Sequence, residues 1–222
     1  DGMGGHSSGE IASKIAVEEL SEFFSMTGKD HEATWPYKMD KTRNYDENRL
    51  ATGIKLANVR IFEKASSEQR FRGMGTTIVA SVIVNERLIT VNVGDSRAYL
   101  FHDGKLRQLS RDHSMRKEFF SPFESNAQDL SHVLTQAIGP QPAINPHVNI
   151  CRIAEDDLIL LCSDGLTSVL SDSEIRNVLG DKPFSEAADE LLARVFANDG
   201  DDNVSIILSK VIEVIPAKAV RG

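Results

Sequence analysis

Hydrophobic positions in the first third of the chain recur at helical spacing. Apolar side chains between residues 11 and 24, and again between residues 50 and 62, fall on one face of a helix. The pattern predicts helices at about 7–28 and 47–65. Ser7 precedes Glu10 by the spacing of a capping box, and Thr27-Gly28 supplies an end signal for the first helix.

After Gly73 the pattern changes to short β-branched runs separated by turns. Strands are predicted at 76–84, 87–93, 97–102, 105–109, 148–153, 158–162 and 204–214. Short turns join the first four, which must therefore be antiparallel, because a parallel crossover needs about a dozen residues. A capping box from Ser171 to Glu174 predicts a short helix, and residues 185–197 predict another.

This order of elements predicts an α+β fold of antiparallel sheets flanked by helices, since it lacks the strand-helix alternation of a parallel sheet. No repeat or linker divides the chain, so residues 1–222 are expected to form a single domain. Residues 115–135 lie in an irregular stretch and are predicted to form a flap-like surface loop.

The composition is that of an ordinary globular protein with an acidic balance. The formal net charge is -8, which argues against nucleic acid or an anionic membrane as partner and leaves carboxylates free to bind cations. The sequence shows neither an apolar run of transmembrane length nor a signal-peptide pattern at its start. These features favour a cytoplasmic protein.

The two cysteines, Cys151 and Cys162, lie in apolar strand-like runs. Inert core packing is the favoured interpretation of both thiols. A disulfide, if the two strands pair, and a reactive thiol are the alternatives.

Four acidic motifs place an aspartate at the end of an apolar strand or beside glycine. They are Asp1-Gly2-Met3-Gly4-Gly5, Gly94-Asp95-Ser96-Arg97, Ser163-Asp164-Gly165 and Asp201-Asp202-Asn203. Glycine lets the backbone approach an ion closely, and oxygen ligands without His or Cys indicate a hard cation such as Mg²⁺ or Mn²⁺. Taken singly, each motif also fits an ordinary turn, and Asp103-Gly104 is interpreted as a hairpin turn only.

Together these motifs resemble, in order, those of the type-2C, metal-dependent serine/threonine phosphatases, and most closely the compact bacterial members. The matching segments are Asp1-Gly2-Met3-Gly4-Gly5-His6, Gly75-Thr76-Thr77, Asn92-Val93-Gly94-Asp95-Ser96-Arg97, Asp112-His113-Ser114, Ser163-Asp164-Gly165-Leu166 and Asp202-Asn203-Val204-Ser205. The resemblance spans essentially the whole chain. It implies a β-sandwich of two antiparallel sheets flanked by helices on both sides, a four-layer αββα fold.

The resemblance also implies a site and a reaction. Asp1 would bridge two Mn²⁺ or Mg²⁺ ions, Gly2 would offer its carbonyl, and Asp164 and Asp202 would complete the binuclear site. Asp95, with Asp164, would help to hold a third, weaker ion. Asp1, Asp164 and Asp202 would act in catalysis through metal-bound water, which hydrolyses phosphoserine or phosphothreonine in proteins without a phosphoenzyme.

The implied partners are phosphorylated proteins, including the substrates of a serine/threonine kinase, and the protein is expected to be a monomer. The alternative is a catalytically inactive, phosphatase-like binding or regulatory module. Two features motivate it: Met3 stands where some relatives have a proposed general acid, and family members carry roughly thirty residues before the position of Asp1, including a phosphate-binding Arg. We therefore expect the numbering to begin inside a longer chain.

Other residues near these motifs have two interpretations each. His6 and His113 could supply protons, but structural, hydrogen-bonded roles are favoured. Arg97 could touch phosphate, but a salt bridge that ties down its loop is favoured. Gly73-Met74-Gly75 lacks the Lys and Ser/Thr of a phosphate-cradling loop and is interpreted as a tight turn into a strand.

Overall fold

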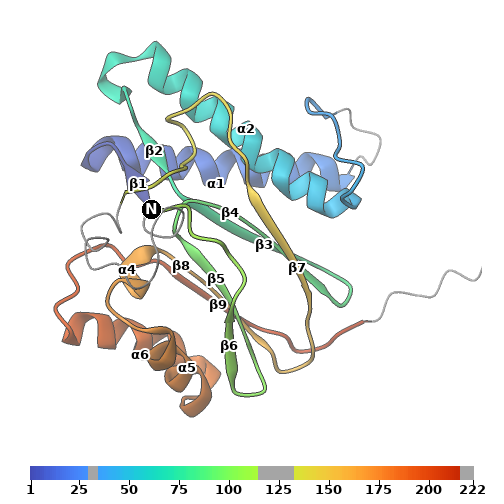
Figure 1. Cartoon of the computed structure of the whole chain (residues 1–222), viewed down its shortest axis with the longest axis vertical. Coiled ribbons are helices and arrows are strands. Elements are labelled where there is room, and N and C mark those ends of the chain that lie inside the picture. The colour runs from blue at the N-terminus through green and yellow to red at the C-terminus, as the bar shows by residue number, and fades with distance from the viewer. Residues whose placement is uncertain (30–34, 115–132, 216–222) are drawn as a thin grey trace, which may run out of the picture.

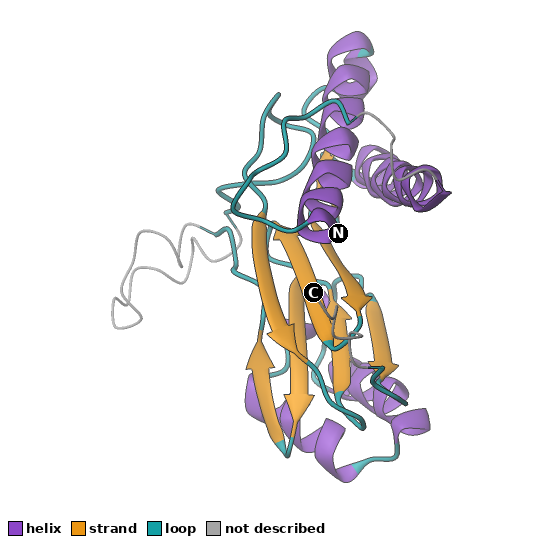
Figure 2. Ribbon diagram, turned by 90° about the vertical axis from the view of Figure 1, so that its right-hand side faces the viewer, coloured by secondary structure: helices purple, strands orange, loops and turns teal. Residues whose placement is uncertain are grey.

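The chain folds into antiparallel sheets that lie between two groups of helices. The structure is a computed structural model that describes residues 1–29, 35–114 and 133–215. Its helices are α1 (His6–Lys29), α2 (Tyr45–Ser67), α4 (Asp164–Thr167), α5 (Asp172–Asp181) and α6 (Phe184–Ala197), with a 3-10 turn η1 (Gln69–Phe71). Figures 1 and 2 show α1 and α2 at one end of the molecule and α4, α5 and α6 at the other, with the strands between them.

The strands form two main sheets and one small one. The strands are β1 (Gly2–Met3), β2 (Gly75–Thr76), β3 (Ile78–Val84), β4 (Arg87–Val93), β5 (Arg97–His102), β6 (Lys105–Gln108), β7 (His147–Arg152), β8 (Leu158–Cys162) and β9 (Ile206–Lys210). One sheet has the order β3-β4-β7, the second β6-β5-β8-β9, and β1 pairs with β2. Every pairing is antiparallel, and β3 with β4 and β5 with β6 pair as their short turns predicted. The short turn between β4 and β5 instead connects the two main sheets, so these two strands do not pair.

Three buried clusters show that the two main sheets are stacked. The first lies between α1, α2 and the three-stranded sheet, and the second between the four-stranded sheet and α4, α5 and α6. The third lies between the sheets and contains Leu88, Leu100 and Ile159. Along β8, Leu160 faces the helices and Ile159 faces the other sheet, because neighbouring strand residues point to opposite faces. The four-layer αββα prediction is confirmed.

The predicted helix starts had mixed outcomes. At α5, Ser171 caps the helix and forms the predicted box with Glu174. At α1 the predicted box is wrong, because the helix already begins at His6 and the carbonyl of Gly5 accepts the N–H groups of Ser8 and Gly9, both at 3.0 Å.

The predicted strand 76–84 is divided between two sheets. Thr76 pairs with Gly2 and forms a bridge with Ile138, whereas Ile78 begins the pairing with β4. The predicted closing strand 204–214 is shorter, at Ile206–Lys210. Most of the predicted flap, 115–135, lies outside the described residues.

The two cysteines lie in different sheets, Cys151 on β7 and Cys162 on β8, and both are free thiols. The disulfide alternative is therefore wrong. Burial raises the pKa of both thiols, that of Cys162 to about 12, as inert core packing requires. No helix in the described ranges is long and apolar enough to cross a membrane.

Candidate metal centre

Three aspartates from distant parts of the chain meet at one end of the sandwich. Asp1 precedes β1, Asp95 lies in the turn between β4 and β5, and Asp164 begins α4 directly after β8. One carboxylate oxygen from each lies within 4.8 Å of the other two. The pairing of β5 with β8, in which Arg97 faces Cys162, brings the last two aspartates to the same sheet end.

The backbone around Asp1 is held by the segment that leads into β3. The Asp1 carbonyl accepts hydrogen bonds from the Thr77 N–H at 2.8 Å and from Thr76 Oγ1 at 2.7 Å. Gly2 lies so close to α1 that a Cβ on it would be 2.1 Å from the Gly9 carbonyl oxygen. Two facing glycines therefore allow the first strand to pack against the first turns of α1.

The loop that carries Asp95 is fixed by two neighbours, Thr77 and His113. Gly94 has a φ of +106°, and a Cβ on it would be 2.6 Å from the side chain of Thr77. The hydroxyls of Thr77 and Ser96 are 2.7 Å apart. The Gly94 N–H donates to His113 Nδ1 at 3.1 Å, and the His113 N–H donates back to the Gly94 carbonyl. The structural interpretation of His113 is therefore confirmed.

Ser163 fastens the segment before β9 against Asp164. Its Oγ accepts the Ser205 N–H at 2.9 Å and donates to the Asn203 carbonyl at 3.3 Å. A Cβ on Gly165 would lie 2.4 Å from the same Asn203 carbonyl oxygen. The motifs Ser163-Asp164-Gly165 and Asp202-Asn203 are thus adjacent in space, as their chemistry requires.

Asp202 lies at the edge of this group and outside the three-aspartate cluster. Its side chain is exposed, and its Oδ1 accepts the N–H of Asn203 at 2.7 Å. Asp202 nevertheless directly precedes Asn203, whose carbonyl oxygen lies against Gly165 beside Asp164.

The electrostatics of the cluster fit a cation. Burial, followed by the charge of Asp164, raises the pKa of Asp95 from its ordinary value of 3.8 to about 6. Asp95 Oδ1 is buried and makes no hydrogen bond to any described residue. Gathered carboxylates repel one another unless a positive charge compensates them, and an all-oxygen donor set suits Mg²⁺ or Mn²⁺.

The sequence of the chain matches that of a known protein family. The family model described as protein phosphatase 2C matches residues 1–210. The chain belongs to the protein phosphatase 2C family. A serine/threonine phosphatase stp from Listeria welshimeri is 33% identical over 219 residues, which cover 94% of this chain and 81% of that protein.

Solved structures of this family share the fold. The Mycobacterium tuberculosis serine/threonine phosphatase PstP/Ppp superposes with a TM-score of 0.81 at 28% identity, covering 96% of this chain and 86% of that one. A PstP catalytic domain in complex with 2 manganese ions gives a TM-score of 0.75 at 28% identity over the same shares, 96% and 86%. The family is one of metal-dependent enzymes, so the protein is a serine/threonine phosphatase and not an inactive module.

Arg97 has a structural role in this phosphatase. Its guanidinium donates to the buried carboxylate of Asp112, with a shortest distance of 2.7 Å, and to the Tyr99 hydroxyl at 3.0 Å. The predicted salt bridge is confirmed. Gly73 has a φ of +78° and leads into β2, so the predicted tight turn is confirmed as well. The side chain of His6 lies outside what the structure describes.

Sequence reasoning missed one residue that positions the site and assigned no role to another. Gly9 lies inside α1, where glycine disfavours the helix, and this cost is the signal that could have revealed its close contact with Gly2. Thr77 belongs to the Gly75-Thr76-Thr77 motif, but its contacts with Asp1 and with the Asp95 loop could not be predicted, because they join residues far apart in the chain.

Proposed function

We propose that this phosphatase hydrolyses phosphoserine and phosphothreonine in proteins by direct attack of water, with two Mn²⁺ or Mg²⁺ ions as cofactors. The observation that carries the proposal is the cluster of Asp1, Asp95 and Asp164, in which Asp95 Oδ1 is buried without a hydrogen bond to a described residue. When bound, such cations activate water and neutralise charge on a phosphate.

The proposed ligands differ in how the fold supports them. Asp1 and Asp164 belong to the cluster, and we propose that Asp202 and the carbonyl of Gly2 complete a binuclear site around them. Asp95, with Asp164, is the proposed ligand of a third, weaker ion. The exposed position of Asp202 is consistent with a ligand that turns toward a cation only when the cation is bound.

The nucleophilic side chains beside the cluster are hydrogen-bonded to other groups or stay protonated, which supports attack by water. The hydroxyl of Ser96 bonds to Thr77, and the hydroxyl of Ser163 bonds to the backbone of Asn203 and Ser205. The thiol of Cys162 is buried, and its raised pKa, about 12, keeps it protonated. No covalent phosphoenzyme is required on this arrangement.

Three further properties belong to the same proposal. The substrates are proteins phosphorylated by a serine/threonine kinase, which this enzyme would oppose. The protein acts as a monomer and in the cytoplasm. The acidic net charge of -8 and the lack of clustered cations in the sequence support a protein substrate over a nucleic acid.

The direct test measures hydrolysis of p-nitrophenyl phosphate and of a phosphothreonine peptide with Mn²⁺, with Mg²⁺ and with EDTA. We expect turnover of both substrates with either metal and none with EDTA. Calorimetric titration of Mn²⁺ into EDTA-treated protein should show two sites and a weaker third. Activity that survives EDTA would refute the metal-dependent mechanism, and a protein that binds no Mn²⁺ would refute the proposed ligands.

A further inference from the structure

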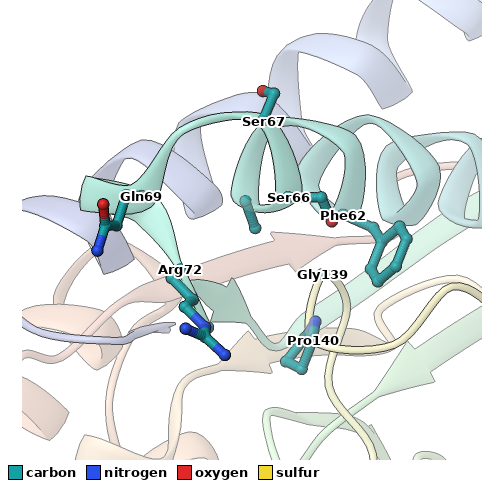
Figure 3. Close-up of a pocket in the computed structure, with 9 residues that line it drawn as sticks. Phe62, Ser66, Ser67, Gln69, Arg72, Gly139 and Pro140 are labelled. Atoms are coloured by element: carbon teal, nitrogen blue, oxygen red, sulfur yellow. The ribbon is translucent and has the colours of Figure 1, made fainter.

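A cavity of about 680 Å³ lies at the C-terminal end of α2, away from the aspartates. It opens between α2, η1 and the loop at Gly139-Pro140. Figure 3 shows the side chain of Arg72 extending from the end of η1 toward Pro140, beneath the last turns of α2, with Phe62 facing the same space. The volume is in the range of ligand pockets, and its walls combine apolar surfaces with polar side chains such as Ser66 and Gln69.

Arg72 brings an uncompensated positive charge to this cavity. It is exposed and makes no ion pair or hydrogen bond through its guanidinium to any residue in the described ranges. Arg70, two residues earlier, behaves differently, since Glu68 binds it at 2.7 Å and 2.9 Å. In a chain of net charge -8, a cation left without a carboxylate partner is available for an anionic ligand.

The wall opposite Arg72 is preformed. The Gly139 N–H donates to Asn58 Oδ1 at 2.8 Å, and the Asn58 amide donates to the Gln141 carbonyl at 3.0 Å. Asn58 is buried in α2, and a Cβ on Gly139 would be 2.4 Å from Ile61. Because the loop is fixed to α2, a ligand does not have to order it, and less binding energy is lost.

A short segment of backbone joins the cavity to the aspartate cluster. Thr76 forms a bridge with Ile138, next to the cavity wall, and the Thr77 N–H binds the Asp1 carbonyl. Arg72 and Thr77 are five residues apart, so their Cα atoms are separated by at most about 18 Å, the reach of a fully extended chain. An extended peptide of about six residues spans this distance.

We propose that this cavity docks the protein substrate, with Arg72 binding an acidic side chain within about six residues of the phosphorylated one. The inference rests on the proposed phosphatase function and adds a substrate preference to it. Phe62 and Pro140 supply apolar surface for the aliphatic part of a Glu side chain, and the guanidinium pairs with its carboxylate.

The test uses phosphothreonine peptides in which one Glu is moved stepwise along each side of the phosphothreonine, against peptides with Gln at the same position. We expect one or two Glu positions to lower KM about three- to tenfold with kcat unchanged, and Arg72→Gln to abolish that preference. Arg72→Lys should retain part of it. Arg70→Gln, in the same turn but paired to Glu68, is the matched control and should retain all of it.

Several results would overturn the docking site: no Glu position changes KM, Arg72→Gln affects Glu and Gln peptides alike, or Arg70→Gln has the same effect. Hydrolysis of p-nitrophenyl phosphate reports the chemistry separately and should be equal in wild type and Arg72→Gln. Fluorescence anisotropy of labelled peptides in EDTA measures docking without turnover. A Glu preference that depends on Arg72 in this assay supports the docking site even if hydrolysis fails, which would refute the proposed function alone.

Discussion

Asp95 and Asp112 lie close to the same sheet end, yet the fold surrounds them differently. The carboxylate of Asp112 is buried and accepts hydrogen bonds from Arg97 and from Gln108, both at 2.7 Å. Asp95 Oδ1 is also buried, but it has no hydrogen-bond donor among the described residues. Burial and the nearby charge of Asp164 raise the pKa of Asp95 to about 6.

This difference shows which of the two carboxylates the Arg97 guanidinium neutralises. Arg97 is only two residues from Asp95, but its guanidinium binds Asp112 and ties down the segment that follows β6. Asp95 is left facing Asp164. The structural carboxylate of Asp112 is thus paired within the protein, whereas burial and the charge of Asp164 together raise the pKa of Asp95, a cost that a bound cation would relieve. Such a site exchanges stability for function.

The largest effect is expected when the cluster itself is broken. Asp164→Ala removes a carboxylate that lies within 4.8 Å of both other aspartates, and kcat on a phosphothreonine peptide with Mn²⁺ should fall about 10³-fold. Asp103→Asn removes the same charge from a hairpin turn with a φ of +47° that Asn tolerates, and should leave kcat unchanged. Equal activity of Asp164→Ala and wild type would show that the cluster does not bind the catalytic metal.

The compensated aspartate can be tested by removing its cation. Arg97→Met leaves Asp112 buried without its ion pair and should lower the free energy of unfolding by about 3 kcal/mol, measured by urea denaturation in EDTA. Arg152 is exposed, and its contact with Glu86 is long, at 3.7 Å, so Arg152→Met should cost less than about 0.5 kcal/mol. If the two variants were equally stable, the pairing of Asp112 would not be what fixes this loop.

Replacing Asp95 should have the opposite effect and raise the free energy of unfolding. Asp95→Asn removes a charge that is partly buried and repelled by Asp164, so the metal-free protein should gain about 1–2 kcal/mol in free energy of unfolding near pH 7.5. Added Mn²⁺ should stabilise the wild type more than the variant. Asp201→Asn, an exposed neighbour of Asp202, is the control and should change stability by less than about 0.5 kcal/mol. A destabilised Asp95→Asn protein would contradict the view that this carboxylate is strained.

The sequence predicted those strands whose ends are marked by local turn signals. The strands at Arg87–Val93, Arg97–His102 and Leu158–Cys162 have the predicted bounds, because short apolar runs end at polar or glycine-containing turns. The two-residue strands β1 and β2 and the single turn α4 were not predicted. They are too short to show a period, and contacts between distant segments, such as Thr77 with Asp1, define them.

For the site, the sequence could indicate four candidate aspartates from their motifs but not how closely their side chains lie together. Asp1, Asp95 and Asp164 come together because β5 pairs with β8 and β1 with β2, and this register is set by the whole sandwich. Asp202 is in the expected motif, yet the loop leaves its side chain exposed. Helix glycines carried a usable signal: Gly53, like Gly9, lies in close contact, with Leu20 2.6 Å from an added Cβ.

The smallest expected effect is the pH dependence of the stability that Asp95 contributes. Asp95 has a folded pKa of about 6, above its ordinary value of 3.8, so the folded protein holds this proton more tightly than the unfolded chain does. In EDTA, its contribution to stability should therefore be greatest near pH 4 and decline as the pH rises to about 6, by about 1 kcal/mol. Thermal unfolding of wild type and Asp95→Asn across this range measures the difference. His102, whose pKa the carboxylate of Asp157 raises, titrates in both proteins and cancels. A gap between the two proteins that did not change with pH would mean that Asp95 does not titrate near 6, and that its carboxylate is compensated as fully as that of Asp112.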